Sequence, residues 1–275
     1  MRQIKDIHQQ KKSEGKPAFS FEFFPPKTEK GEEALFGSVL PELQTMAPDY
    51  CSVTYGAGGS TRDKTLDMVE RIQKDFGLVC MSHLTCVQAT KEQIAQVLQD
   101  AEKRNIRNIL ALRGDPPGGV GPFEATEGGF AYSKDLVAFI RAHHDWGRLK
   151  EKVDAGADFV VTQLFFDNED FLRFRDHMVK KLGMHQTLIP GILPVLSTRH
   201  IQRFTELCGA SIPTPMMQRL EDLSEDDAAA AAFGIEYAVG QCEELLKEGV
   251  AGLHFYCLNK AHSTLEVARA LASHR

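Results

Sequence analysis

Short apolar runs alternate with amphipathic stretches along most of the chain. Seven of these runs are rich in β-branched and aromatic residues and are too short for buried helices, so they are predicted to be strands. Nearly continuous apolar runs are typical of strands covered on both faces, as in a parallel sheet. The predicted strands cover residues 19–24, 50–55, 79–85, 108–113, 158–166, 188–194 and 252–258.

Between the strands, apolar residues recur with the i, i+3, i+4, i+7 spacing that places them on one face of a helix. Regular alternation of strands and helices predicts an α/β fold with parallel strands. The predicted helices cover residues 65–76, 91–103, 135–143, 146–156, 198–207, 215–223, 226–248 and 263–273.

The spacing of the strands predicts a TIM barrel with one strand missing. The first four strands begin roughly thirty residues apart, which is one strand–helix unit each, but a (β/α)8 barrel needs eight strands and only seven are found. The interval from 108 to 158 holds a Gly/Pro-rich loop and two helices joined directly at 144–145. A strand of about five residues has no room there. We predict a single barrel domain over 1–275, with 1–17 as a helical or flexible extension.

Composition narrows the class of protein. Lys and Arg number 32 against 38 Asp and Glu, so the net charge of −6 offers no basic surplus for nucleic acid. No apolar run reaches the ~18 residues of a membrane-spanning helix, and the charged N-terminus lacks the apolar core of a signal peptide. The six cysteines form no CxxC pair. We therefore expect a cytoplasmic protein with buried, reduced thiols and no metal site.

The first strand carries the most informative polar residue, Glu22, between phenylalanines in the run FSFEFF. Active-site residues of a parallel barrel lie at the C-terminal ends of its strands. Burial would raise the pKa of this carboxyl and hold its proton near neutral pH, which suits a general acid. The alternative is a structural glutamate paired with Arg or Lys inside the barrel.

Three other segments are candidates for binding. Arg113, Gly114 and Asp115 end the fourth strand and open a long loop, and loops of that length are often functional. The glycine-rich run 56–60 could bring backbone N–H groups to a phosphate. It matches neither the GxGxxG dinucleotide fingerprint nor a Walker loop. His83 is either a site residue or a core histidine. The phenylalanines at 21, 23, 24, 165 and 166 are interpreted as core.

Seven motifs, in order, resemble the methylenetetrahydrofolate reductase family: FSFEFFPPKT, SVTYGAGGSTRDKT, SHLTC, NILALRGDPP, DAGADFVVTQLFFDNEDFLRFRD, IPGILPV and GLHFYCLNK. The resemblance runs from about residue 19 to residue 270. It implies a TIM barrel that holds FAD and reduces 5,10-methylenetetrahydrofolate to 5-methyltetrahydrofolate in one-carbon metabolism. NADH or NADPH would reduce the flavin and leave before folate binds, in a ping-pong sequence. Relatives of this kind form homo-oligomers, so the same is expected here.

The resemblance also implies roles for individual residues. Glu22 matches the general acid, Asp115 matches an aspartate that holds the pterin near the flavin, and Gln163 matches a glutamine that contacts folate. The other substrate-side positions are Phe204, His200 and Lys260, and the last two replace the family's more common glutamine and arginine. Positions that match the FAD shell are Thr54, Tyr55, Ala57, His83, Leu112, Arg113, Gly114, Asp115, Tyr132, Ser133, Asp145 and Lys152.

Relatives have a strand and a flavin-contacting loop between the helices predicted at 135–143 and 146–156. The strand count and the resemblance therefore agree on one missing element. The segment has been removed from the natural sequence, or omitted from it, or the protein has an altered barrel. We favour a removed or omitted segment, because a missing central strand leaves two unpaired edges.

A real loss of that segment would weaken both FAD binding and stability. Two other functions therefore stay open. One is a relative that reduces folate without flavin, and the other is a noncatalytic barrel subunit that binds folate or a partner protein.

Overall fold

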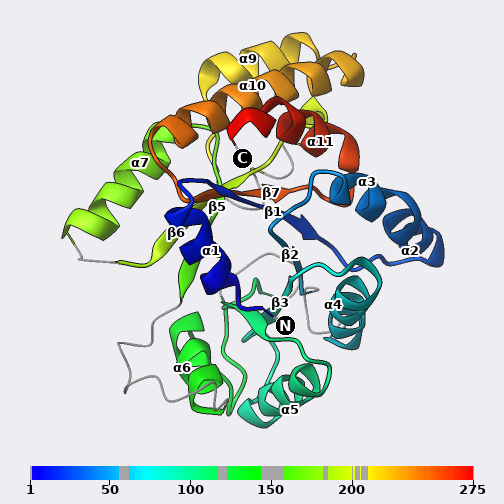
Figure 1. The fold of residues 1–275 in the computed structure, drawn as a ribbon, viewed down its shortest axis with the longest axis vertical. Coiled ribbons are helices and arrows are strands. Elements are labelled where there is room, and N and C mark those ends of the chain that lie inside the picture. The colour runs from blue at the N-terminus through cyan, green and yellow to red at the C-terminus, as the bar shows by residue number, and fades with distance from the viewer. Residues whose placement is uncertain are drawn as a thin grey trace. The chain divides into compact units, whose positions relative to one another are not determined.

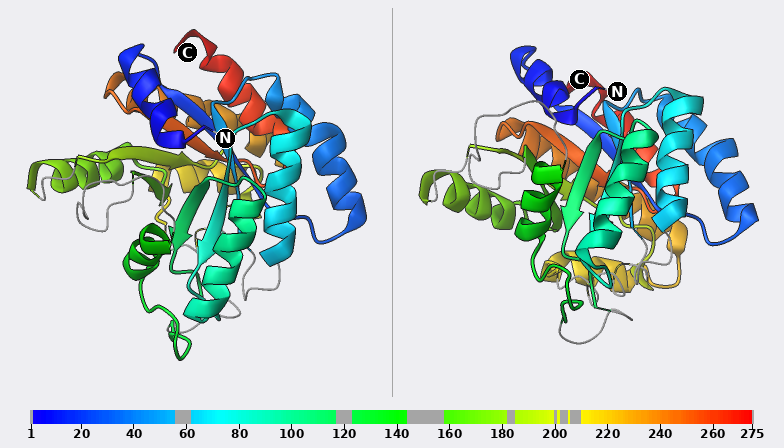
Figure 2. Two further views of the ribbon diagram at one scale, coloured as in Figure 1. Left: turned by 60° about the horizontal axis from the view of Figure 1, so that its bottom comes forward. Right: turned by 90° about the horizontal axis from the view of Figure 1, so that it is seen from below.

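A computed structural model describes residues 2–55, 62–116, 123–143, 158–181, 185–199, 201, 205 and 210–274 (Figures 1 and 2). The chain divides into two compact units, which are described separately. The first consists of residues 1–4, 23–28 and 50–158, and the second consists of residues 5–22, 29–49 and 159–275.

All seven predicted strands are present, and the pairs β1–β7, β2–β3, β3–β4, β5–β6 and β6–β7 are parallel. The first unit holds the order β4-β3-β2, and the second holds β1-β7-β6-β5, so the first strand neighbours the last. Among the described residues no strand lies between β4 and β5, which is consistent with the predicted (β/α)8 barrel that has one strand missing. The bounds are β1 Ala18–Phe23, β2 Tyr50–Val53, β3 Cys80–Thr85, β4 Asn108–Leu112, β5 Phe159–Leu164, β6 Thr187–Ile192 and β7 Gly252–Tyr256.

The helices are α1 Ile4–Ser13, α2 Glu29–Ala34, α3 Leu40–Gln44, α4 Arg62–Phe76, α5 Lys91–Lys103, α6 Ser133–His143, α7 Asn168–Asp176, α9 Thr214–Asp222, α10 Asp227–Lys247 and α11 Ala261–Ala270. Short π-helices cover Leu35–Val39 and His177–Lys181, and a 3-10 turn covers Ala272–His274. Six predicted helices are confirmed as α4, α5, α6, α9, α10 and α11. The helix at 146–156 lies outside the described residues, and that at 198–207 is described only in part.

In the first unit, α4 and α5 lie side by side (Figure 2), with α4 packed against β2 and β3. The Arg104 guanidinium at the end of α5 reaches Asp67 and Glu70 of α4. Thr90 and Gln93 form a capping box that starts α5, satisfying backbone N–H groups at its first turn. The apolar stripe of α5 packs into a buried cluster that includes Leu84, Cys86, Ile94, Leu98, Phe130 and Leu136.

In the second unit, β1 carries aromatic side chains on one face and polar side chains on the other. Phe19 and Phe21 pack against Phe255 of β7 with ring centroids 5.9 and 6.0 Å apart. Ser20 and Glu22 alternate with these phenylalanines and point to the opposite face. Helices α10 and α11 pack against each other on one side of the β1–β7 pair (Figure 1). The interpretation of Phe21, Phe23 and Phe166 as core is confirmed, since each is at most 3% exposed.

Within the second unit, Asp49 links helix α1 to strand β1. The Asp49 carboxylate accepts a 2.8 Å hydrogen bond from the Phe19 amide and pairs with Lys11 Nζ at 2.8 Å. His8 lies on the same helix, buried, with its ring 5.3 Å from that of Phe159. Burial lowers the pKa of His8 to about 4, although the nearby Asp49 charge opposes this change.

The five described cysteines are buried and unpaired, which confirms the expectation of thiols for these five. Cys51 and Cys80 lie opposite each other on β2 and β3. Burial, strengthened by the neighbouring Cys51, raises the pKa of Cys80. Within the described ranges, no helix combines the length and apolar character needed to cross a membrane.

We predict that His8 makes the protein less stable in mild acid. Below pH 6.5 the unfolded chain binds a proton at His8, but the folded chain does so only near pH 4, so acid favours unfolding. Between pH 6.5 and 5 this should cost about 2 kcal/mol of unfolding free energy. Urea unfolding of wild type and His8→Leu at pH 7 and pH 5 tests this. An equal loss in both proteins would show that His8 is not the titrating group.

Candidate active site

The predicted site residues fall in both units, and each set is described within its own unit. Five lie outside the described residues: Ala57, Asp145, Lys152, His200 and Phe204.

In the second unit, Glu22 belongs to a buried row of three polar side chains. The register of β1 and β7 places Ser20 opposite His254, and Glu22 follows Ser20 by two positions on the same face. Ser20 Oγ lies 2.8 Å from His254 Nδ1, and Glu22 Oε2 lies 3.3 Å from His254 Nε2. All three residues are at most 5% exposed. His254 is therefore a partner of the Glu22 side chain.

The row can store one proton in two places. The proton lies on the Glu22 carboxyl, which then donates to Nε2, or on Nε2, which then donates to the carboxylate. The Ser20 hydroxyl can accept from Nδ1–H or donate to bare Nδ1, so it satisfies either form of the ring. Burial disfavours a lone carboxylate, and the imidazole offers the carboxylate form a hydrogen bond. This arrangement can deliver a proton and take it back.

The turn after β7 is tied to the same strand. The Cys257 thiol donates to the backbone carbonyl of Glu22 at 2.6 Å, and the Lys260 amide donates to the carbonyl of Cys257 at 2.8 Å. Leu258 and Asn259 between them have φ values of 50° and 56°, in the left-handed region that ordinary residues rarely adopt. Such strain is typical of functional turns. Lys260 is exposed at the start of α11.

Gln163 lies on β5, and its side chain is exposed. Its Oε1 accepts a 3.1 Å hydrogen bond from the Leu164 amide. The next link towards Glu22 is Tyr256, whose hydroxyl donates to the Thr162 carbonyl at 2.7 Å and whose ring meets that of His254 edge-on at 5.3 Å. The structure therefore connects Gln163 and Glu22 through contacts within one unit.

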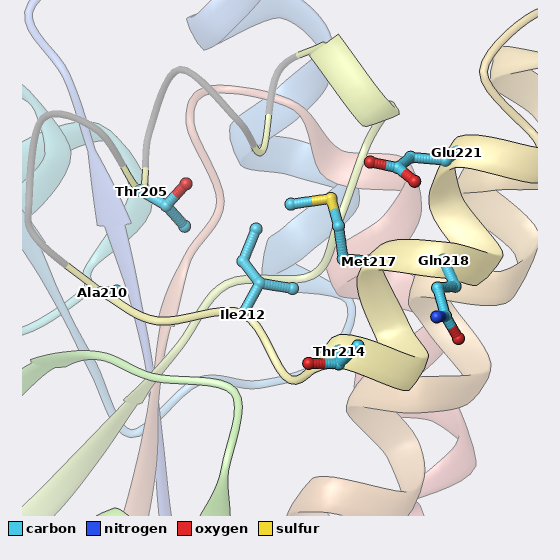
Figure 3. Close-up of a pocket in the computed structure, with 7 residues that line it drawn as sticks. All are labelled: Thr205, Ala210, Ile212, Thr214, Met217, Gln218 and Glu221. Carbon is cyan, nitrogen blue, oxygen red and sulfur yellow. The ribbon is translucent and has the colours of Figure 1, made fainter.

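A cavity of about 450 Å³ lies beside α9 (Figure 3). Ile212 and Met217 supply its apolar part, between Thr205 and the helix (Figure 3). Thr205 directly follows Phe204 in sequence. Ile212 and Tyr256 both pack against the buried cluster that contains Leu164, so the cavity lies beside the cluster that strand β5 enters with the residue after Gln163.

In the first unit, the ends of β2 and β3 carry Thr54, Tyr55, His83 and Thr85. The Thr54 amide donates to the Phe23 carbonyl at 2.9 Å, and its own carbonyl accepts from the Thr65 hydroxyl at 3.1 Å. His83 and Thr85 lie two positions apart on β3, each 6% exposed. Among the described residues, the buried Thr85 Oγ1 has no hydrogen-bond partner. A buried hydroxyl in that state costs free energy unless something pairs with it.

The end of β4 brings Arg113 to the surface over the Phe123 ring, with its guanidinium 5.0 Å from the ring centroid. Gly114 follows with φ of 84°, and a Cβ there would lie 3.0 Å from Thr85 and Val87 side-chain atoms. Glycine is thus needed both for the backbone angle and for the close approach to β3. Asp115 is exposed beyond this turn.

Tyr132 and Ser133 start α6, and Tyr132 is 59% exposed, which is unusual for a large aromatic residue. The Cys86 thiol lies 3.8 Å from the Tyr132 carbonyl. Burial, with a smaller contribution from Asp135, raises the pKa of Cys86 to about 11, while Arg113 opposes the rise. This thiol is therefore protonated at neutral pH and is no nucleophile.

Comparison with known proteins identifies the family. The family model for methylenetetrahydrofolate reductase matches residues 6–146 and 142–272. The chain belongs to this family. It is 37% identical to methylenetetrahydrofolate reductase (NADH) 1 of Arabidopsis thaliana over 296 residues, covering 96% of this chain and 49% of the plant protein. It is 36% identical to 5,10-methylenetetrahydrofolate reductase of Escherichia coli over 279 residues, covering 94% of this chain and 92% of the bacterial one.

The chain spans about half the length of the plant reductases that it matches. Both alignments are longer than the part of this 275-residue chain that they cover, so the reductases carry residues without a counterpart here. The two matches to the family model overlap at 142–146, where the sequence predicts the missing strand.

A solved structure shares the fold. An uncharacterized protein from Clostridium thermocellum, which binds two copies of 5-methyl-5,6,7,8-tetrahydrofolic acid, superposes with a TM-score of 0.58 at 16% identity. The match covers 95% of this chain and 97% of that one. It supports the fold of this reductase family member.

Sequence reasoning missed the partners of the predicted residues. Ser20 was not predicted, and Thr162, His254 and Tyr256 stand out in the sequence only as polar residues within predicted strands. Alternation along β1 places Ser20 beside Glu22, but only the β1–β7 register shows that His254 joins them.

We predict that Gly114→Ala destabilises the protein by about 2 kcal/mol, because alanine is strained at positive φ and its Cβ would crowd β3. Gly240→Ala is the control, since it lies in α10 with open space around it and should be neutral or stabilising. Urea unfolding compares the two variants with wild type. An equal effect of both substitutions would contradict the close packing of Gly114 on β3.

Proposed function

We propose that the protein reduces 5,10-methylenetetrahydrofolate to 5-methyltetrahydrofolate, with NADH or NADPH as the source of hydride and FAD as the relay, in a ping-pong sequence. The observation that carries this proposal is the buried Ser20–His254–Glu22 row in a member of the reductase family. A noncatalytic folate-binding subunit would have no use for a proton-storing row at the expense of core packing.

The first unit has groups that suit FAD. Arg113 offers an exposed guanidinium for a phosphate, Tyr132 an exposed ring for stacking, and Thr85 a buried hydroxyl that lacks a partner among the described residues. Thr54, Tyr55, His83, Leu112, Gly114 and Ser133 would complete the described part of the shell. FAD, when bound, takes hydride from the reduced nicotinamide and passes it to folate.

Glu22 would act as the general acid. Its proton goes to a nitrogen of the five-membered folate ring, so the ring opens to the reactive iminium. A neutral His254 ring that carries its proton on Nε2 donates from Nε2 to the carboxylate that remains, while the Ser20 hydroxyl donates to the bare Nδ1. Because the row is buried, water does not compete for the proton.

Asp115, Gln163 and Lys260 would bind folate. An exposed carboxylate accepts hydrogen bonds from a pterin, an exposed amide both donates and accepts, and an exposed ammonium attracts an anionic tail. Lys260 stands where relatives have arginine. Its ammonium would bind an anionic group as a single charge, whereas a guanidinium would form two parallel hydrogen bonds. Phe204 and His200 complete the proposed substrate side.

Folate reduction without flavin is the second candidate. It is favoured by one observation, which is that reductases of the family carry residues that this chain lacks. In the resemblance these residues include flavin contacts, so their loss would weaken FAD binding.

An absorbance spectrum of the purified protein from 300 to 550 nm tests the first candidate against the second, with intact mass measured on the same sample. Flavin bands at nearly one per chain support the FAD-dependent reductase. A flavin-free protein of 30.6 kDa that still reduces folate supports the second candidate. A protein without either property would refute both.

We further propose a cytoplasmic homo-oligomer. The five described cysteines are all unpaired thiols, as is usual in a reducing compartment.

We predict that Glu22→Gln lowers folate reduction by a factor of about 10² to 10⁴, the usual contribution of a general acid. Oxidation of NAD(P)H with a quinone dye needs no proton from Glu22 and should change little. Glu33→Gln is the control, because Glu33 is exposed on α2. Steady-state rates of the two half-reactions test this prediction. An equal loss of both rates would show that Glu22 is not the general acid.

A further inference from the structure

Strand β5 departs from regular pairing where it presents Gln163. Val161 pairs with Ile189 of β6, but Leu164 pairs with Gly191, so two residues of β5 stand opposite the single Pro190. This extra residue is a β-bulge, a feature that redirects side chains. Gln163 is exposed at the bulge, while Leu164 beside it is buried.

Pro190 explains why the ladder breaks here, because proline has no N–H to donate. The groups next to it bond to side chains instead. The Gly191 amide donates to the Thr162 hydroxyl at 3.0 Å, and the Thr162 carbonyl accepts from the Tyr256 hydroxyl at 2.7 Å. Both main-chain groups at the bulge are satisfied by these two side chains.

Tyr256 comes from β7, on the far side of β6, so its ring must cross Gly191 to reach β5. A Cβ at Gly191 would lie 2.6 Å from Tyr256 Cε2 and 2.6 Å from the Thr162 carbonyl oxygen. No side chain fits there without moving the ring. The hydrogen bond of Tyr256 to Thr162 therefore requires glycine at position 191.

We propose that Tyr256 is a positioning residue: its hydroxyl holds the β5 bulge in the shape that presents Gln163 to folate. This inference rests on the proposed function, because only that function makes folate the ligand of Gln163. The edge-on contact with His254 means that the same ring also borders the Ser20–His254–Glu22 row. Tyr256 thus links the groups proposed to bind folate with those proposed to protonate it.

The test is Tyr256→Phe, which keeps the ring and removes only the hydroxyl. The KM for methylenetetrahydrofolate and the Kd for 5-methyltetrahydrofolate should rise about fivefold, the effect of one lost hydrogen bond. NAD(P)H oxidation with a quinone dye should be unchanged. Gly191→Ala should act in the same direction, because it displaces the ring.

Tyr237→Phe is the matched control. Tyr237 is half-buried like Tyr256, and its hydroxyl donates to a backbone carbonyl, that of Phe166, at 2.6 Å in the same unit. Both variants should lose similar stability in urea. Only Tyr256→Phe should weaken folate binding, and an equal effect of both on folate Kd would overturn the positioning role.

A double mutant separates action through Gln163 from a direct contact. In a Gln163→Ala background, Tyr256→Phe should have no further effect on folate Kd. Additive effects would overturn the proposal. Wild-type protein that binds no 5-methyltetrahydrofolate would refute the proposed function and the inference with it, whereas wild-type binding that Tyr256→Phe leaves unchanged would refute the inference alone.

Discussion

The pairing of the first strand with the last is the constraint on which the second unit depends. The parallel register sets Ser20 against His254 and Phe21 against Phe255. One face of the pair is therefore aromatic and packs, while the other gathers polar groups that bond to one another. A slip of one residue would exchange the two faces, placing Glu22 among phenylalanines and the aromatic rings beside His254.

The polar face extends across the neighbouring strands by a chain of contacts. The ring of His254 meets that of Tyr256 edge-on, and the Tyr256 hydroxyl donates to the Thr162 carbonyl at the β5 bulge. Because Pro190 has no N–H to donate, the Thr162 carbonyl and the Gly191 amide bond to side chains instead of to the main chain of the neighbouring strand. An irregularity in the ladder is thus compatible with full hydrogen bonding, because side chains replace the main-chain partners.

Periodicity alone locates most of the fold. Strands covered on both faces stand out as apolar runs, and α5 begins and ends where its apolar stripe predicts. Helices α2, α3 and α7 were not predicted. The first two are short and interrupted by a π-turn, and α7 is rich in charged residues, so none shows a long apolar stripe. The gap between β4 and β5 was found by counting strands.

The candidate site is less readable from sequence. An isolated glutamate among phenylalanines points to Glu22, but its partners come from strand register, which no local pattern contains. The β5 bulge is equally hidden, because it depends on a proline in one strand and a tyrosine in another.

The distance along the chain between Ser20 and His254 has a consequence for biosynthesis. The two residues are separated by 234 positions, and their strands pair only after the chain between them has been made. During synthesis the first strand leaves the ribosome long before its neighbour, and must wait with its phenylalanines uncovered. Pairings of such high contact order are slow to form. The segment around β1 is therefore exposed to aggregation in the nascent chain until β7 has been made.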